Sequence, residues 1–501
     1  MHHTENITEC QFFIACTAPP KHSISYLIIW QVIAIYAETI GAISDWLYSY
    51  ILIILLLVVG LYFTWQTNFV QFRLVWESIR CVAEPKSEAN SISAFQALMV
   101  STAARVGVGN ISGVSTAIIL GGAGSIFWMW VITLICGASA FIESTLAQIY
   151  KKRAADGSSF GGPAYYIQAA CNSRLLGKLF AVAIIVTYLG GFSMVSAFNI
   201  VSAFSAYSFF NPTTTPLLIG ITLALLTALC IFGGGKRVGQ ISSFLVPLMA
   251  ISYLAVAIII VFRNIELFPS MVAAIFYGAF DFTAIFGGFA GSAIMHGIRR
   301  GLYSNEAGVG SAPIAAAAAS VSHPVKQGLA QMLSVYIDTL VLCTATAVML
   351  LCSGVAGAPE LIGVPYVQAA VAANFGYWGI HFVTFSIFCF AFASILGSFF
   401  YAEANLKYLT KGTTSRVVLF SFRLVAVLIV CLGALLEFSV VWNTADVMMG
   451  LMALINLPVI MLLREPALRC LQDYLRQRRA GKEPVFKAVN IGLRDETDFW
   501  R

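Results

Sequence analysis

The chain has 501 residues, of which 59% are apolar and only 10% charged, with a formal net charge of +6 and a mean hydropathy of +0.85. So few charges cannot cover the surface of a water-soluble protein of this length, which excludes a soluble globular protein and predicts an integral membrane protein in the lipid bilayer. The basic residues gather in alternate loops and in the tail 464–501, so the positive charge is a topology signal and nucleic acid is not an expected partner.

Apolar windows of membrane-spanning length recur along the whole chain. A bilayer core of about 30 Å needs about 20 apolar residues per helix. The segment 25–43 is either a further span or a helix at the membrane interface, because Gln31 and Glu38 interrupt its apolar run. About eleven spans are predicted, at 46–65, 94–120, 123–149, 178–205, 215–232, 239–262, 273–298, 326–352, 377–407, 414–436 and 438–463.

No low-complexity linker divides the chain. We therefore expect one transmembrane domain over residues 46–463, preceded by an N-terminal extension over 1–45 and followed by a basic tail over 464–501. The cysteines are scattered and include no C-x-x-C pair, so the sequence predicts neither a disulfide framework nor a metal site.

The orientation in the membrane follows from the basic loops, because short cytoplasmic loops hold an excess of Lys and Arg. This rule places the C-terminus in the cytoplasm and the start of the first predicted span outside. The residues counted on the basic side are Arg73, Arg80, Lys86, Lys151, Lys152, Arg153, Lys236, Arg237, Arg299, Arg300, Lys326, Lys407, Lys411 and Arg416.

The span 94–120 contains an unusual stretch, "RVGVGNIS", at residues 105–112. A single glycine in a membrane helix usually lets a neighbouring helix approach. Two glycines beside Asn110 at mid-membrane depth instead predict that the helix unwinds. Unwound backbone inside a membrane must be buried in protein or line a cavity, where its N–H groups bind carboxylates and its carbonyls bind small cations.

A second glycine-rich stretch, "GGFAGSA" at residues 287–293, lies in the predicted span 273–298. The two stretches occupy matching places if the first repeat covers about 94–262 and the second about 273–463. Five helices per repeat place the repeats in opposite orientations, which is typical of secondary transporters with a substrate site near the membrane midplane. An enzyme is not expected, because no nucleophile lies beside a base. A channel or a transporter-like sensor remains the alternative class.

Four longer motifs resemble the alanine or glycine:cation symporter family. They are "GVGNISGVSTAIILGGAGSIFWMWV" (107–131), "GGPAYYI" (161–167), "RGLYSNEAGVGSAPIAAAAA" (300–319) and "HPVKQGLAQMLSVYIDTLVLCTATA" (323–347), and the resemblance covers about residues 45–490. It implies an all-α, leucine-transporter type fold with ten core helices in two inverted repeats and one extra N-terminal helix.

The resemblance also implies the activity. We expect symport of a small neutral amino acid into the cell by alternating access, with sodium as the coupling ion and no cofactor. Alanine is the first candidate, with glycine and serine behind it. We expect a monomer in the plasma membrane of a prokaryote, which is the inner membrane in a Gram-negative cell. If protons replace sodium, Glu143 is the acid that would carry them.

Site residues are carried over from the resemblance as expectations. Backbone groups of the first broken helix are expected to hold the substrate carboxylate, and carbonyls of the second to hold the ammonium group. The amide oxygen of Asn110 is a hard ligand that suits Na⁺, with an interhelical hydrogen bond as its alternative role. The expected substrate ligands are Gly107, Val108, Gly109, Asn199, Phe286, Gly287, Gly288, Phe289, Ser394 and Ser398, and the expected sodium ligands are Val106, Asn110 and Ser394.

This sequence departs from the family pattern in ways that bear on the substrate. Ser398 stands where the alanine and glycine carriers tend to have Trp, and Ala197 stands where a Gln is common. Both changes enlarge the expected cavity, so a larger substrate such as glutamine is the alternative to alanine. Ala393 replaces what is often a Thr, which leaves the number of sodium ions open.

Buried charges form the last group of expectations. A charge at the bilayer centre costs about 3 kcal/mol on insertion scales. Arg105 is therefore expected to pair with an acid, with contact to the substrate carboxylate and replacement of a cation as alternatives. The available acids are Glu143, Asp281 and Asp338.

Bracing and gating roles are expected for Glu143 and for residues 304–306. Glu143 is expected to brace the helix 94–120 from behind. Ser304, Asn305 and Glu306 are expected in a cytoplasmic loop that latches the inner gate, with an ordinary solvated turn as the alternative.

Overall fold

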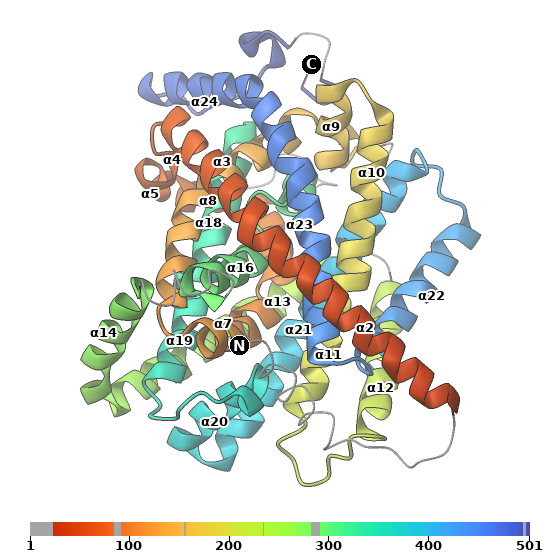
Figure 1. Ribbon diagram of the computed structural model, residues 1–501. Coiled ribbons are helices and arrows are strands. Elements are labelled where there is room, and N and C mark those ends of the chain that lie inside the picture. The colour runs from red at the N-terminus through yellow and green to blue at the C-terminus, as the bar shows by residue number, and fades with distance from the viewer. Residues whose placement is uncertain are drawn as a thin grey trace.

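The computed structural model describes residues 24–84, 92–154, 157–233, 235–281, 291–493 and 497–500, and for 24–30 and 235–246 the backbone only. Helices dominate this part of the chain, and its strands form one short hairpin (Figure 1). By length and apolarity, seven described helices could cross a membrane, or nine if each bent pair counts as one span. The shorter apolar helix α12 matches the predicted span 215–232.

The elements have the following bounds. In the first half of the chain they are α2 (Ile24–Trp46), η1 (Leu47–Leu52), α3 (Ile53–Gln66), α4 (Val70–Arg73), α5 (Val75–Val82), α6 (Ala94–Arg105), η2 (Gly109–Gly113), α7 (Val114–Gly121), α8 (Ser125–Ile149), β1 (Lys152–Arg153), β2 (Ser159–Phe160), α9 (Pro163–Cys171), α10 (Arg174–Ile185), η3 (Val186–Phe192), α11 (Ser193–Ala203), α12 (Thr215–Ile231) and α13 (Gly235–Arg263). In the second half they are η4 (Ile265–Leu267), α14 (Phe268–Ala279), α16 (Ala293–Asn305), α17 (Ala312–Ala318), α18 (Pro324–Tyr336), η6 (Ile337–Cys343), α19 (Thr344–Leu351), η7 (Pro359–Leu361), α20 (Val364–Phe375), α21 (Tyr377–Leu409), α22 (Arg416–Gly433), α23 (Phe438–Leu462), α24 (Arg464–Arg479) and η8 (Ala488–Ile491).

The N-terminal helix is longer than expected. Helices α2, η1 and α3 follow one another without a break, so the segment 25–43 is neither a separate span nor a separate interfacial helix. The proposed boundary at residue 45 falls inside this helix. In Figure 1 it crosses the front of the molecule diagonally, and it packs against α23 and α8.

The first interrupted helix begins at a capping box. The side chain of Ser93 accepts a hydrogen bond from the backbone N–H of Gln96, and the Gln96 side chain accepts one from the Ser93 N–H. These two bonds satisfy donors that a helix start leaves unpaired, which fixes where α6 begins. The helix then bends by 52° between α6 and the η2–α7 segment, as the glycine-rich stretch predicted.

The second repeat begins later than predicted. The span 273–298 does not form one helix: α14 turns by 85° from α13 and packs against the start of α8, where the Trp128 indole donates a hydrogen bond to the Ala279 carbonyl. The helix that matches α6 and α7 is instead α16 followed by α17, separated by the non-helical residues 306–311. The residues 287–290 of "GGFAGSA" lie outside the described part of the chain, as do Phe286, Gly287, Gly288 and Phe289.

The four half-helices are arranged in antiparallel pairs. A Cβ added at Gly121 would lie 2.8 Å from His296 near the start of α16, and one added at Gly109 would lie 3.1 Å from the Ser304 Cα near its end. Helix α7 therefore runs against α16 in the opposite direction, and α6 packs against α17. This is the arrangement expected of inverted repeats.

Two arginines assigned to a cytoplasmic loop are buried in α16. Arg299 pairs with Asp446 at 2.8 Å and with Asp45 at 2.7 Å, and Arg300 also pairs with Asp446. These partners come from α23 and α2, far away in the sequence. Counting Lys and Arg in loops was wrong here, because the pairing is invisible to a local window.

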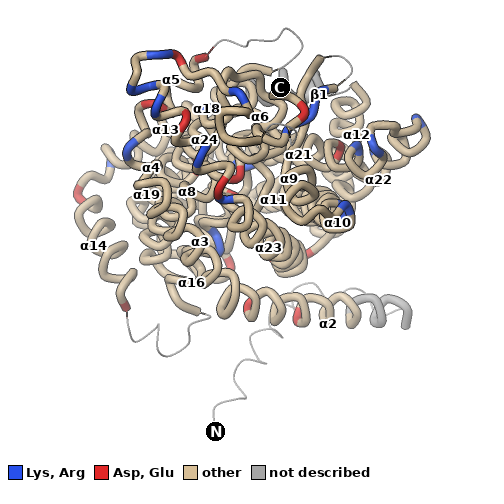
Figure 2. The backbone as a smooth tube through the Cα atoms, turned by 90° about the horizontal axis from the view of Figure 1, so that it is seen from above, with Lys and Arg blue, Asp and Glu red and all other residues tan. Residues whose placement is uncertain are grey.

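The C-terminal segment docks on the side of the molecule that carries α5, α9 and α24. Helix α24 contacts α8 and α18, and Figure 2 shows charged residues around α5 and α24 on this side of the molecule. Further along, the Trp500 indole donates a hydrogen bond to the Gln148 carbonyl at 2.6 Å. The Gln148 side chain in turn donates to the carbonyl of Ala319, just after α17, at 2.9 Å.

Candidate functional site

The first interruption is residues 106–108, between α6 and η2. The Val106 N–H makes the last α6 bond, to the Thr102 carbonyl, and its ψ of 96° takes the chain out of the helix. The side-chain oxygen of Asn110 then accepts a hydrogen bond from the Gly107 N–H at 3.0 Å. The Asn110 side chain thus caps one backbone N–H, that of Gly107, just before the half-helix that begins at Gly109.

Both glycines of "VGVGN" allow close approach as well as unwinding. A Cβ on Gly107 would lie 2.1 Å from the Ser394 hydroxyl of α21. A Cβ on Gly109 would lie 3.1 Å from Tyr303 and from Ser304 of α16. The backbone of the first interruption is therefore in direct contact with both α21 and α16.

The second interruption is residues 306–311, and it repeats the G-V-G pattern of the first. Three of its residues have left-handed backbone, with φ of 53° at Glu306, 84° at Gly308 and 96° at Gly310. Ser304, Asn305 and Glu306 are all at most 1% exposed, so this stretch is neither a cytoplasmic loop nor a solvated turn. It lies inside the protein between two half-helices.

Glu143 of α8 holds the second interruption. Its carboxylate accepts hydrogen bonds from the Gly308 N–H at 3.2 Å and from the Asn456 amide at 2.8 Å. Asn456 also donates to the Gly308 carbonyl at 2.9 Å and accepts from the Tyr166 hydroxyl at 2.6 Å. The expectation that Glu143 braces the first broken helix was wrong, because its bonds go to the second.

A buried polar cluster joins the first interruption to α16 and η6. The Asn110 amide donates to Asp338 Oδ1 at 2.8 Å, and the Ser304 hydroxyl donates to Asp338 Oδ2 at 2.5 Å. The hydroxyls of Thr339 and Thr346 add bonds to Asp338 and to the Asn110 carbonyl, at 3.0 and 2.6 Å. Asn110 therefore has the interhelical role that was its alternative, and its oxygen is used by Gly107.

Arg105 ends α6 and is only 3% exposed. One guanidinium nitrogen, Nη1, donates to the Ser334 hydroxyl at 3.0 Å, whereas Nε and Nη2 have no hydrogen-bond partner. It forms no ion pair with a carboxylate of the described residues, although its charge acts on Glu143, Glu306 and Asp338. The predicted direct pair with an acid was wrong.

The remaining predicted ligands lie on α21 and α11. The Ser394 hydroxyl donates to the Phe390 carbonyl at 3.1 Å and lies 3.4 Å from the Ala103 carbonyl. Ser398, one helical turn further on, is fully buried and its hydroxyl has no partner. On α11, which packs against α21, Asn199 donates to the Val195 carbonyl at 2.8 Å and its oxygen has no partner.

Several polar residues of this region were not predicted. Tyr188 donates to Glu306 at 2.6 Å, and Thr346 and Asn456 make the bonds described above. Their only signal in the sequence is a hydroxyl or amide inside an apolar span. Three π-helical turns, η2, η3 and η6, carry Asn110, Tyr188 and Asp338, and such turns are frequent at functional sites.

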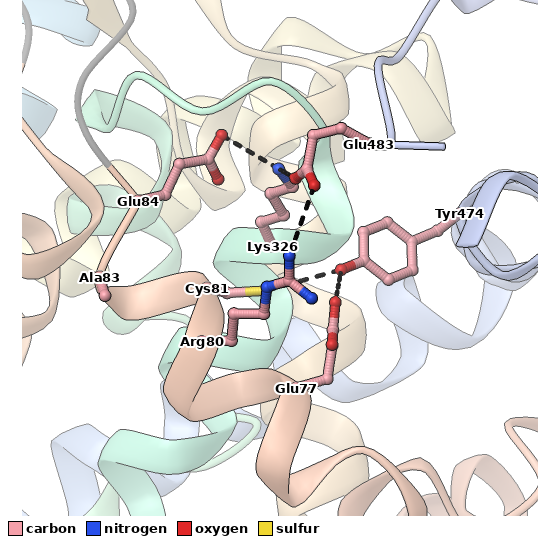
Figure 3. Close-up of a pocket in the computed structure, with 8 residues that line it drawn as sticks. All are labelled: Glu77, Arg80, Cys81, Ala83, Glu84, Lys326, Tyr474 and Glu483. Atoms are coloured by element: carbon pink, nitrogen blue, oxygen red, sulfur yellow. Dashed lines mark hydrogen bonds and ion pairs between the residues drawn. The ribbon is translucent and has the colours of Figure 1, made fainter. Parts of the chain in front are cut away.

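A separate pocket of about 250 Å³ lies between α5, the start of α18 and α24 (Figure 3). Its charges are paired with one another: Lys326 lies 3.0 Å from Glu84 and 2.6 Å from Glu483, and the Tyr474 hydroxyl donates to Glu77. Burial raises the pKa of the Cys81 thiol to about 12, so that thiol is not a nucleophile. The pocket is a junction that fastens α24, and among the described residues no group of acids, His and Cys could hold a metal ion.

Two interrupted helices that meet inside a bundle of apolar helices define a multi-pass membrane transporter. In fold, the chain is similar to a manganese transporter mutant from Eremococcus coleocola, with a TM-score of 0.51 over 78% of this chain and 81% of that chain, at 12% identity. Residues 33–488 match the model of the Sodium:alanine symporter family, and the chain belongs to that family.

The relatives to which the chain is similar are named as symporters or amino-acid carriers, in line with this family. The chain is 42% identical to the "Probable sodium/glutamine symporter GlnT" of Bacillus subtilis, over 90% of this chain and 93% of that protein. It is 43% identical to the "Amino-acid carrier protein AlsT" of the same organism (91% and 96%) and 35% identical to the "Sodium/alanine symporter AgcS" of Methanococcus maripaludis (85% and 95%). The protein is therefore a membrane symporter of an amino-acid-transport family and not an enzyme.

Proposed function

We propose that this protein couples sodium to the symport of a neutral amino acid into the cell by alternating access. The observation that carries the proposal is the meeting of half-helix ends at the two interruptions, where the start of the outgoing half-helix at Gly109 lies against Ser304 at the end of α16. A helix start presents free N–H groups and about half a positive charge, and a helix end the opposite. A zwitterion is complementary to such a pair of ends.

The substrate carboxylate has suitable donors at the first interruption. The Gly107 N–H is used by Asn110, which leaves the N–H groups of Val108 and Gly109 at the helix start. The two free nitrogens of Arg105 add charged donors nearby. Since charge-assisted bonds are stronger than neutral ones, these groups favour a carboxylate over a neutral ligand end.

Sodium has suitable oxygen ligands between α6 and α21. The Ser394 hydroxyl lies within 3.4 Å of the carbonyls of Ala103 and Phe390, and the Val106 carbonyl belongs to the unwound stretch beside them. Hard oxygens converging from two helices suit a small cation. Asn110 would act on this site indirectly, by ordering the chain at Gly107, instead of through its own oxygen.

Transport would follow from movement of the half-helices that face one side of the membrane. The start of α6 and the end of α17 meet at Ile92 and Ala319, which the C-terminal segment approaches through Gln148, whereas α7 and α16 pack on each other away from it. Rocking one set of half-helices against the other would therefore expose the site alternately. The basic tail supports a cytoplasmic α24 side in a prokaryotic plasma membrane. We propose that a single copy of the chain carries out transport.

Alanine is the first candidate substrate and glutamine the second. Ser398 favours glutamine, because it is buried beside the site and its hydroxyl is free to meet a polar side chain. The relative GlnT, which is named a probable sodium/glutamine symporter, supports the same candidate.

The test is uptake of labelled alanine into proteoliposomes under an inward Na⁺ gradient, with a matched K⁺ gradient as control and unlabelled glutamine as competitor. Sodium-dependent accumulation that glutamine blocks weakly supports alanine, and strong competition by glutamine transfers the assignment to glutamine. Equilibration without accumulation would indicate a channel, and binding without uptake a sensor. Either of these last two results would overturn symport.

A further inference from the structure

Glu306 is an unusual acid at the second interruption. Its side chain is fully buried, and one carboxylate oxygen, Oε2, accepts hydrogen bonds from the Tyr188 hydroxyl at 2.6 Å and the Ser311 hydroxyl at 2.5 Å. The other oxygen, Oε1, has no partner. The residue also holds a left-handed φ of 53°, which costs little for glycine but strains a side chain such as Glu.

The three buried acids around the interruptions differ in this respect. Both oxygens of Glu143 accept bonds, from Gly308 and Asn456, and both oxygens of Asp338 accept bonds from Asn110, Ser304 and Thr339. Glu306 alone among these three has an oxygen left over. A buried carboxylate with an unused oxygen is costly unless a cation or donor meets it.

The surroundings of Glu306 supply the other parts of an amino-acid site. The ring of Tyr401 packs edge-on against Tyr188 at 5.1 Å, and its buried hydroxyl has no partner. Glu306 also directly follows α16, whose C-terminal carbonyls carry negative partial charge.

We propose that Glu306 binds the ammonium group of the substrate through Oε1, with Tyr188 and Ser311 as residues that position the carboxylate. This inference rests on the proposed transport of an amino acid and adds the residue that recognises the amine. The symporter then selects a substrate for its positive charge as well as its size. Analogues that carry a hydroxyl in place of the amine are rejected, because they leave the Glu306 charge unpaired.

The test compares binding of an amino acid and of its α-hydroxy analogue, either alanine with lactate or glutamine with 2-hydroxyglutaramate, to the purified protein in Na⁺. The unchanged protein should prefer the amino acid by about 100-fold or more, as expected when a buried charge loses its partner. Glu306→Gln keeps acceptors for Tyr188 and Ser311 but removes the charge, so the preference should fall below about tenfold. Glu306→Asp keeps the charge on a shorter side chain, so its preference for the amino acid should lie between those of the unchanged protein and Glu306→Gln.

The control is Glu143→Gln, which weakens the brace of the same interruption. It should change affinity for both ligands by a similar factor and leave their ratio near that of the unchanged protein. An unaltered ratio in both Glu306 variants, each eluting as a single folded species, overturns the role of Glu306 while leaving symport intact. If the unchanged protein binds neither amino acid, the proposed function itself fails.

Discussion

The hydroxyl of Ser394 lies where the β-carbon of any residue larger than glycine at position 107 would have to be, since the two would be 2.1 Å apart. The chain thus brings α21 against the bare backbone of the first interruption. Real Cβ atoms do not approach so closely, so a methyl group at position 107 must displace the Ser394 hydroxyl or the backbone around it.

We expect Gly107→Ala to reduce sodium-driven uptake at least tenfold, because a misplacement of about 1 Å at a binding site costs on the order of 100-fold in rate. Gly190→Ala is the matched control: a Cβ there makes only ordinary contact at 3.9 Å with Met448. Uptake in proteoliposomes, corrected for the amount of folded protein, measures both. Equal activity of the two variants would show that the contact with Ser394 has no consequence.

The buried acid Asp446 should be more important for stability than the exposed Asp45, although both pair with Arg299. Asp446→Asn breaks two buried ion pairs and should lower the free energy of unfolding by about 3–5 kcal/mol. The side chain of Asp45 is 52% exposed, so Asp45→Asn should cost about 1 kcal/mol or less. Thermal unfolding in detergent checks the difference, and similar Tm decreases would refute it.

The brace of the second interruption provides another stability test. Asn456→Ala removes the donor to Glu143 and the bonds to Gly308 and Tyr166, and should cost about 3 kcal/mol, because buried polar groups lose their partners. Tyr166→Phe removes one hydroxyl bond and should cost about 1 kcal/mol. If Tyr166→Phe lowers the Tm as much as Asn456→Ala does, the bonds to Glu143 and Gly308 do not contribute as described.

The contact between His323 and α24 should make the docking of that helix sensitive to pH. His323 Nδ1 accepts from the Val325 N–H at 3.3 Å, and Nε2 lies 3.4 Å from Asp473. Burial lowers the pKa of His323 below its usual value of about 6.5, so the folded state favours the neutral ring. The contribution of His323 to the docking of α24 is therefore fully present above about pH 6.5, and it is lost as the pH falls below this value.

Asp473 also contributes to the docking of α24, and its contribution is likewise lost as the pH falls, but over a lower pH range. Hydrogen bonding by His323 lowers the pKa of Asp473 to about 2, so its contribution is present above about pH 4 and is lost as the pH falls toward 2. The protection factors of the α24 amides, which are their exchange rates corrected for the intrinsic effect of pH on exchange, should fall between pH 6.5 and 5 in the unchanged protein. His323→Asn keeps a helix-capping oxygen without a titrating ring, and protection factors that still fall over this range in the variant would rule out His323 as the cause.

The first interruption was predictable because Arg105, two glycines and Asn110 stand out in an apolar window. The second was misplaced for two physical reasons. The second half of the chain has two glycine-rich stretches, and Arg299 and Arg300 looked like loop residues although acids from distant helices neutralise them. Local hydropathy cannot detect such pairing.

The chemistry of the site was predictable only in part. Ser394 was placed correctly against the first broken helix, because α21 packs on α6. The hydrogen-bond partners of Asn110 and Glu143 were not predicted correctly, because they depend on which buried groups each side chain meets after folding. A sequence specifies which polar side chains enter the bilayer, whereas their partners follow from long-range packing.

The docked C-terminal segment has a consequence for biosynthesis. The bond from Trp500 reaches the Gln148 carbonyl, and the Gln148 side chain holds the carbonyl of Ala319 beside α17. During translation, α8 and α17 leave the ribosome well before residue 500 does. The contact that holds the end of α17 through Gln148 therefore forms only after both helices have been synthesised, so removal of the Trp500 side chain would loosen the end of α17.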